Sequence, residues 1–218
     1  MNNFNNWDDF FKTIDFTFYR TSQIQTKYID IIAKKSKEFH NPKLLEIAGG
    51  SGYTSVVLAD LLKKSNIKII YSDLSEKLVA EVRKKFNTNK IEFSVQDSNN
   101  LSFNNNSVDI IFHQGFLEHF DDNQIIKFLK EQARVAKYII FDVPNSRRWN
   151  KNQEFGNERF LSHKEWQNLV KKAGLTIHEV TARRFSNSWK KFMPIALVES
   201  NLFHNLFGES TIIVCGIK

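Results

Sequence analysis

The chain shows two kinds of apolar pattern: short continuous runs, and residues that recur at helical spacing. Leu44, Leu45 and Ile47 form a short run of the kind found in a buried strand, whereas residues 53–62 place apolar side chains one helical turn apart. Along the chain these patterns predict strands at 43–47, 67–72, 90–95, 108–113, 138–143, 175–183 and 211–217. They predict helices at 53–64, 75–86, 121–135 and 162–173.

Strands that alternate with helices fold into a mostly parallel sheet covered by helices on both faces. The last two strands are not joined by a recognisable crossover helix, so one of them is expected to run antiparallel. Residues 1–40 predict a helical cap, because their apolar residues follow helical spacing and end before Asn41-Pro42. Residues 41–218 are then expected to form the main domain.

Composition sets the broad class of protein. A chain of 218 residues, 41% of them hydrophobic, can bury the core of a single domain. No run approaches the roughly 20 apolar residues of a membrane span, and no leader pattern is visible, so a soluble, unprocessed cytoplasmic protein is expected. The single cysteine, Cys215, cannot form an internal disulfide, which fits a reducing compartment.

The formal net charge of +7 raises the question of a nucleic-acid or membrane surface. The lysine doublets Lys63-Lys64, Lys84-Lys85 and Lys171-Lys172 each fall near the end of a predicted helix. Cations complement the helix dipole at that end, so the charge has a structural explanation.

Polar residues follow four of the predicted strands. Residues 46–52 follow the first strand, Asp73 the second, Asp97 the third, and His113-Gln114 close the fourth. In an open parallel sheet, ligands bind at the carboxyl ends of the strands. An acidic residue at such a position is often only a helix cap. Several of them around one edge nevertheless predict a ligand site.

The segment "KLLEIAGGSGYTSVVLADLL" (43–62) places glycines between a strand and a helix, where backbone N–H groups meet ligands. The dinucleotide motif G-x-G-x-x-G is incomplete, because Ser55 stands at the third glycine. What remains, E-x-A-x-G-x-G, resembles the first motif of the class I S-adenosylmethionine-dependent methyltransferases, and "AGGSG" is similar to the motif of their quinone-biosynthesis branch. Ala48 replaces the first glycine, a mild change if its φ is negative.

The resemblance covers about residues 40–185 and the last strand. "YSDLS" resembles the ribose-binding motif, "VQDSNNLSF" the adenine-binding segment and "NSVDIIFHQGFLEHF" the fourth-strand motif. "RFLSHKEWQNLVKKAGL" is similar to the family's segment between the fifth and sixth strands. The resemblance implies a single-domain α/β fold, a doubly wound, Rossmann-like, mostly parallel seven-stranded sheet whose last strand is antiparallel.

The resemblance also implies the cofactor S-adenosyl-L-methionine. Asp73 would accept both ribose hydroxyls, and Asp97, with Ser98 beside it, would face the exocyclic amine of the adenine. The full set of implied cofactor-binding residues is Glu46, Ala48, Gly50, Gly52, Asp73, Leu74, Asp97, Ser98, His113 and Gln114.

A hydroxyl acceptor must lose a proton during methyl transfer, and histidine is the natural base at neutral pH. The catalytic candidate is His119 in "LEHF", just beyond the fourth strand, with a loop-supporting role as the alternative. Tyr19, Arg20 and His163 are candidates for substrate binding. No spacing of His, Cys, Asp or Glu suggests a metal site.

The acceptor is expected to be a small molecule, a sugar or a lipid-linked compound, methylated on oxygen or nitrogen. The N/D-P-P-Y/F motif of many nucleic-acid methyltransferases is missing, since its position reads "HQGFLEH". The apolar segment 186–208 predicts an acceptor lid or a surface for an apolar substrate or a partner subunit, which leaves a homodimer open. Two alternatives are a non-catalytic member of the same fold and, less favoured, a dinucleotide-dependent oxidoreductase.

Overall fold

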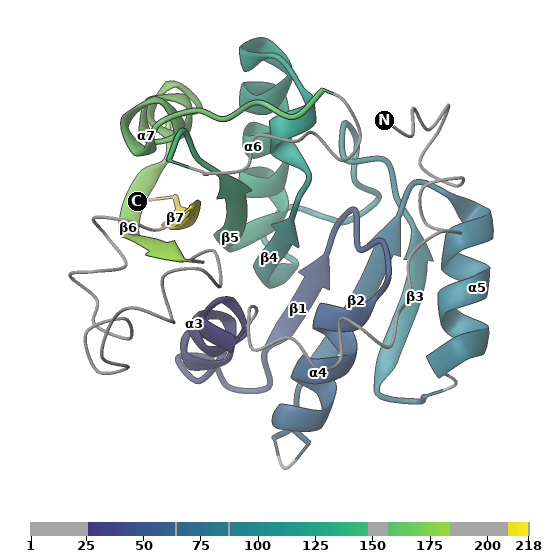
Figure 1. Ribbon diagram of the computed structural model, residues 1–218. Helices are drawn as coiled ribbons and strands as arrows, with labels where there is room; N and C mark the ends of the chain where they lie inside the picture. The colour runs from purple at the N-terminus through teal and green to yellow at the C-terminus, as the bar shows by residue number, and fades with distance from the viewer. Residues whose placement is uncertain (1–25, 64, 87, 148–156, 184–208, 218) are drawn as a thin grey trace, which may run out of the picture.

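The computed structural model describes residues 26–63, 65–86, 88–147, 157–183 and 209–217. Its centre is a seven-stranded sheet in the order β3-β2-β1-β4-β5-β7-β6 (Figure 1). The strands are β1 Lys43–Glu46, β2 Lys68–Asp73, β3 Ile91–Val95, β4 Val108–Gln114, β5 Ala136–Pro144, β6 Thr176–Arg183 and β7 Ser210–Gly216. The expected α/β class and number of strands are confirmed.

The direction of the strands also agrees with the expectation. The pairs β1–β2, β1–β4, β2–β3 and β4–β5 are parallel. β7 inserts between β5 and β6 and is antiparallel to both. Because the first strands are parallel, their carboxyl ends meet at one edge of the sheet.

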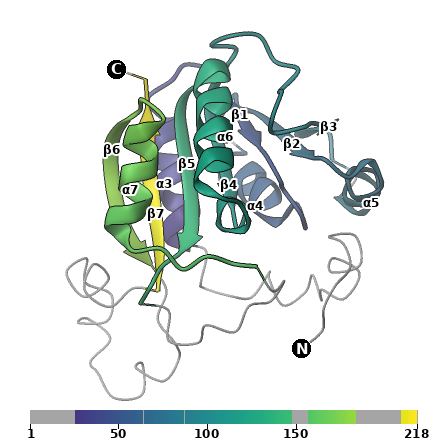
Figure 2. The ribbon, with the colours of Figure 1, turned by 90° about the horizontal axis from the view of Figure 1, so that it is seen from above.

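Helices cover both faces of the sheet. They are α3 Thr26–Ser36, α4 Tyr53–Leu61, α5 Glu76–Phe86, α6 Asp122–Val135 and α7 His163–Lys172, with a short 3-10 helix η2 at Leu117–His119. One apolar cluster joins α3, α4 and α5 to the sheet, and another joins α6 and α7 to it. Figures 1 and 2 show α3 and α4 on the side of the sheet opposite α6.

Successive side chains of a strand point to opposite faces of the sheet, so one strand contributes to the apolar cluster on each face. In β5, Ile140 belongs to the cluster under α3 and α4, whereas its neighbours Ile139 and Phe141 belong to the cluster under α6 and α7. α6 begins after its cap Asp121, which accepts a hydrogen bond from the Gln124 N–H. It runs directly into β5, so this strand starts two residues before the predicted 138.

Some expectations lie outside the described residues. These are most of the cap before residue 26, the segment 186–208, and the candidates Tyr19 and Arg20. The described part of the cap is α3, whose Tyr28 donates a hydrogen bond to the His113 carbonyl at 2.7 Å. Within the described ranges, no helix has the length and apolar character needed to cross a membrane.

Candidate cofactor and acceptor site

The carboxyl ends of β1, β2 and β3 are tied together by hydrogen bonds. The turn after β1 (residues 47–52, the glycine turn) places the Gly50 N–H 3.1 Å from Oδ2 of Asp73 at the end of β2. The Gln96 N–H, just past β3, donates to the Asp73 carbonyl at 3.0 Å. The glycine turn, Asp73 and the segment that carries Asp97 therefore lie side by side, as the sequence predicts.

β2 holds the glycine turn in place. The Tyr71 hydroxyl donates to the Gly50 carbonyl at 2.7 Å, and the Ser72 hydroxyl donates to the Glu46 carbonyl at 2.7 Å. The Gly49 N–H donates to the Ser72 carbonyl at 2.9 Å. These contacts with β2 fix the backbone of the turn beside Asp73.

The glycines of the turn are required for different reasons. Gly50 has φ of 51° and Gly52 has φ of 70°, values that favour glycine. A Cβ on Gly52 would lie 2.5 Å from Cγ1 of Val82, so α5 packs directly against the turn. The motif leaves the position of Gly49 variable. A Cβ on Gly49 would nevertheless clash with the ring of Tyr71, because it would overlap the Cε2 atom of that ring.

Ala48 departs from the sequence expectation. Its φ is 48°, so the condition for a mild substitution, a negative φ, is not met. A left-handed conformation costs an ordinary residue roughly 1–2 kcal/mol. The alanine is held there because Ser72 of β2 fixes the chain on both sides of it: the Gly49 N–H donates to the Ser72 carbonyl, and the Ser72 hydroxyl donates to the Glu46 carbonyl.

We expect Ala48→Gly to stabilise the protein by about 1 kcal/mol, because glycine adopts this φ without strain. Urea denaturation measures the change. Ala80→Gly is the matched control in the exposed middle of α5, where glycine should cost about 1 kcal/mol. Equal losses in both variants would show that Ala48 is not strained.

Glu46 is buried at the end of β1 and accepts a hydrogen bond from the Ser55 hydroxyl at 2.5 Å. Burial raises the pKa of its carboxyl to about 8, against the opposing effect of the Ser55 bond. Ser55, which takes the place of the third glycine of the dinucleotide motif, thus has a defined partner within the turn. Ser55 therefore both breaks the dinucleotide motif and holds the start of α4 to the end of β1 through Glu46.

His113, an expected cofactor contact, is buried on the α6 side of the sheet. Its ring stacks on Phe141, with 5.5 Å between centroids, and Nε2 lies 3.3 Å from Oε1 of Gln132. Burial lowers the pKa of this imidazole to about 3. The structure therefore places the side chain in the core and not with the other candidates, because successive residues of β4 point to opposite faces.

These two buried groups predict how stability depends on pH. The raised pKa of Glu46 stabilises the protein below 4.5, and this stabilisation is lost as pH rises towards 8. The lowered pKa of His113 acts oppositely, since its contribution is complete above 6.5 and is lost towards pH 3. Of these two groups only Glu46 changes its contribution above pH 6.5, and this contribution to the free energy of unfolding should fall by about 2 kcal/mol between pH 6.5 and 8.

Glu46→Gln should remove that alkaline decline, because the amide oxygen still accepts from Ser55 and carries no charge. Denaturation curves at pH 6.5 and 8 measure it. Glu92→Gln, at an exposed carboxylate on β3, is the control and should keep the decline. A parent protein equally stable at both pH values would contradict the assignment.

His119 lies in η2, beyond the carboxyl end of β4. Its Nδ1 is 2.6 Å from Oδ1 of Asn157, whose Nδ2 donates to the His119 carbonyl at 3.5 Å. An amide oxygen only accepts, so Nδ1 carries the proton of the neutral imidazole. Burial lowers the pKa of His119, while Asn157, Glu158 and the Gly115 backbone oppose this. The ring is therefore neutral at neutral pH.

The segment that supplies Asn157 is fixed to η2 and to the start of α6. Arg159 donates its N–H to the Glu118 carbonyl at 2.9 Å and its Nη1 to the Phe120 carbonyl at 2.7 Å. Its Nη2 forms an ion pair with Asp122 at 2.7 Å. Sequence reasoning missed Asn157, since it is 38 residues from His119 and belongs to no quoted motif.

The remaining cofactor candidates differ in exposure. Leu74 is 69% exposed beside Asp73 and offers an aliphatic surface to a ligand. Asp97 is exposed and Ser98 is half-buried in the following turn. Gln114 donates through Nε2 to Oδ2 of Asp142 at 2.7 Å, which holds it against β5.

His163, a candidate for substrate binding, begins α7. Nη1 of Arg147 lies 3.3 Å from its Nε2, and Oγ1 of Thr211 lies 2.7 Å from its Nδ1. Because a guanidinium only donates, Nε2 accepts and Nδ1 donates to Thr211. Both ring nitrogens thus contact the protein, and the substrate role stays a prediction. Among the described residues no group of three His, Cys, Asp or Glu side chains could hold a metal.

Comparison with known proteins identifies this arrangement. Residues 44–138, which hold the glycine turn, Asp73, Asp97 and His119, match a family profile described as a methyltransferase domain. This match, together with the relative described next, supports a class I S-adenosylmethionine-dependent methyltransferase.

Individual relatives agree with this family. The chain is 26% identical over 177 residues to malonyl-[acyl-carrier protein] O-methyltransferase 2 of Coxiella burnetii, covering 80% of this chain and 71% of the relative. A methyltransferase structure from Aquifex aeolicus shares the fold, with a TM-score of 0.67, 16% identity, and coverage of 96% and 97%. Magnesium protoporphyrin IX methyltransferase from Synechocystis, with bound S-adenosylhomocysteine, has a TM-score of 0.64, 14% identity, and coverage of 97% and 93%.

The residues at the sheet edge fit the methyltransferase cofactor, S-adenosylmethionine. Asp73 supplies a half-exposed carboxylate beside the Gly50–Gly52 backbone, where no side chain projects from either glycine. Leu74 adds an exposed apolar side chain at the same place. A sugar with two hydroxyls and an adjacent aromatic base needs acceptors and apolar surface of this kind.

Proposed function

We propose that this methyltransferase acts on an oxygen or nitrogen of a small-molecule, sugar or lipid-linked acceptor, with His119 as the general base. The observation that carries the proposal is the pair of bonds between His119 and Asn157, at 2.6 and 3.5 Å. They fix the tautomer in which Nε2 is the basic nitrogen. When bound, S-adenosylmethionine supplies an electrophilic methyl group on a sulfonium sulfur.

The residues around His119 suit a base that becomes charged during the reaction. The lowered pKa keeps the imidazole neutral before proton transfer, and the charge of Glu158 and the Gly115 backbone favour the cation formed afterwards. Asn157 keeps the ring oriented throughout. Binding of the acceptor beside the ring would also supply orientation, which can contribute roughly 7–11 kcal/mol.

Oxygen is the favoured acceptor atom. The Coxiella relative is named as an O-methyltransferase of malonyl-[acyl-carrier protein], whose free acid group is a carboxylate. A carboxylate attacks without a base, whereas a hydroxyl needs one. The presence of a held, neutral histidine beside the fourth strand supports a hydroxyl acceptor for this chain.

Thermal shift with S-adenosylhomocysteine, NAD and NADP tests the cofactor site. A specific ligand at 100 times its dissociation constant should stabilise by about 2.7 kcal/mol. Stabilisation by NAD alone would contradict the proposal. Incubation of metabolite extracts with the cofactor carrying a labelled methyl group then identifies the acceptor, and label appearing only in nucleic acid would exclude the proposed class.

Two further expectations concern parts of the chain beyond the described residues. Tyr19 and Arg20 are proposed to contact the cofactor's carboxylate or the acceptor, and segment 186–208 is proposed to cover the acceptor or a second subunit. Truncating Phe203 and Phe207 to alanine should raise KM for the acceptor more than for the cofactor. Equal changes in both KM values would indicate ordinary packing.

A further inference from the structure

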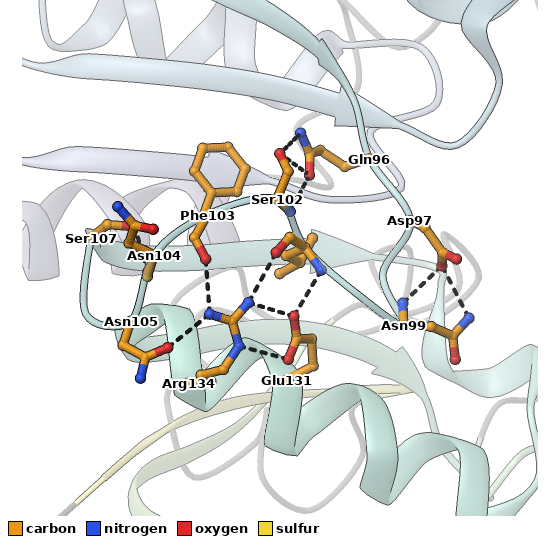
Figure 3. A network of polar contacts seen from close by, with 11 residues as sticks. Gln96, Asp97, Asn99, Ser102, Phe103, Asn104, Asn105, Ser107, Glu131 and Arg134 are labelled. Atoms are coloured by element: carbon orange, nitrogen blue, oxygen red, sulfur yellow. Dashed lines mark hydrogen bonds and ion pairs between the residues drawn. The ribbon is translucent and has the colours of Figure 1, made fainter.

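The loop between β3 and β4 (residues 96–107) carries Asp97 and lies along α6 (Figure 3). Its distal half is bound by Arg134 of α6. Nη1 of this residue donates to the Phe103 carbonyl at 2.8 Å, and Nη2 donates to the Leu101 carbonyl at 2.9 Å. The Asn106 N–H donates back to the Arg134 carbonyl at 2.9 Å.

Glu131 completes this anchor. It pairs with Arg134 through two bonds of 2.7 and 2.9 Å, and its Oε1 accepts from the Leu101 N–H at 2.7 Å. The ion pair thus contacts both the N–H and the carbonyl of Leu101, whose side chain is buried. The distal half of the loop is fixed to α6 without any contact from Asp97.

The proximal half is bound by a separate chain of contacts. Nε2 of Gln124, in the first turn of α6, donates to Oδ1 of Asn99 at 2.6 Å. Asn99 donates its backbone N–H and its Nδ2 to Oδ1 of Asp97, at 2.8 and 3.0 Å (Figure 3). The backbone N–H and the Nδ2 of Asn99 thus both donate to the same oxygen of Asp97. The side-chain oxygen of Asn99 accepts from Gln124 of α6.

We propose that Asn99 and Gln124 are positioning residues for recognition of the cofactor's base, because they orient the Asp97 carboxylate so that Oδ2 faces the exocyclic amine. The inference rests on the proposed methyltransferase function, in which the family resemblance implies that Asp97 binds the adenine. An exposed aspartate that is not held must be ordered when the ligand binds, which lowers affinity. With Oδ1 held by two donors, the carboxylate is oriented in advance.

A cofactor analogue whose purine carries a carbonyl in place of the exocyclic amine tests the orientation of Asp97 directly. A carboxylate accepts from an amine and repels a carbonyl oxygen, so a held Asp97 should prefer S-adenosylhomocysteine over S-inosylhomocysteine. Calorimetry gives the ratio of the two dissociation constants. We expect a ratio of about 10 or more in the parent, the effect of one charge-assisted bond.

Asp97→Ala should reduce this ratio to about 1, whereas Asn99→Ala and Gln124→Ala should lower it about three- to tenfold. Lys127→Ala, at an exposed residue of α6 one turn beyond Gln124, is the matched control and should keep the parent ratio. The distal anchor at Glu131 and Arg134 remains in all of these variants, so the loop is still attached to α6.

The outcomes separate the inference from its premise. If the parent does not discriminate, or Asp97→Ala keeps the parent ratio, Asp97 is not the adenine ligand and the inference fails with that assignment. If Asp97→Ala loses discrimination but Asn99→Ala and Gln124→Ala retain it, Asp97 stands and the inference alone is overturned. An equal loss of affinity for both ligands, with the ratio unchanged, shows a merely structural role and also overturns it.

Discussion

Asp73→Ala is expected to weaken binding of S-adenosylhomocysteine by about 100-fold or more. The Asp73 carboxylate is proposed to accept both ribose hydroxyls, and each charge-assisted bond contributes roughly 1.5–3 kcal/mol. Together they correspond to about two orders of magnitude or more in affinity. Calorimetry measures the change, and an affinity within about threefold of the parent would contradict the assignment, since the loss of even one such bond exceeds that.

The structure adds a second reason for a large effect. Asp73 also accepts from the Gly50 N–H and from the Ser75 N–H, both at 3.1 Å, so alanine removes support from the glycine turn. Asp73→Asn separates the two roles, because its amide retains one acceptor oxygen but has no charge. Asp109→Ala is the control. This aspartate contacts Lys43 and Lys137 at the opposite edge of the sheet, and its loss should leave cofactor affinity unchanged.

The fold was predictable because strands and helices bury their side chains in different ways. β5 contacts an apolar cluster on each face and therefore appears as a continuous apolar run, whereas the helices bury one face and carry apolar residues at one-turn spacing. The spacing of apolar residues does not show where one element ends and the next begins. α6 runs into β5 without a loop, and η2 is too short to show a helical period, so both were missed.

The placement of the candidate site residues was predictable where it depends on backbone position and not where it depends on side-chain direction. Asp73 and the glycine turn meet because parallel strands end at one edge. His113 ends up in the core because a strand residue's face is set by register with its neighbours. The left-handed φ of Ala48 is set by contacts of the turn with β2, which a glycine motif alone does not report.

Contacts between distant residues were beyond sequence reasoning altogether. Asn157 reaches His119 across 38 residues, and Gln124 reaches Asn99 across 25. Asparagine and glutamine are common on loops and helix surfaces, so neither residue type signals a role by itself. Only the folded arrangement shows that Asn157 contacts the candidate base His119, and that Gln124 contacts Asn99, which in turn holds Asp97.

His119→Ala is expected to lower kcat by about 10²–10⁴ if the acceptor is a hydroxyl, the range typical of a lost general base. Affinity for S-adenosylhomocysteine should be nearly unchanged, because Asp73 and the glycine turn remain intact. Asn157→Ala leaves the imidazole but removes the partner of Nδ1, so its kcat should fall less. If the acceptor is a carboxylate or a neutral amine, the loss in His119→Ala should be far smaller.

The pH dependence of kcat distinguishes a base from a structural histidine. The base must be unprotonated, so kcat should fall as pH drops through the pKa of His119, which burial places below its usual 6.5. Asn157→Asp puts a carboxylate beside the Nδ1–H and favours the imidazolium, so the acidic limb should move to higher pH. The limb should vanish from the residual activity of His119→Ala. An acidic limb that stays in place in both variants would mean that another group takes the proton, because neither the charge beside the ring nor the loss of the ring would then affect the titration that controls turnover.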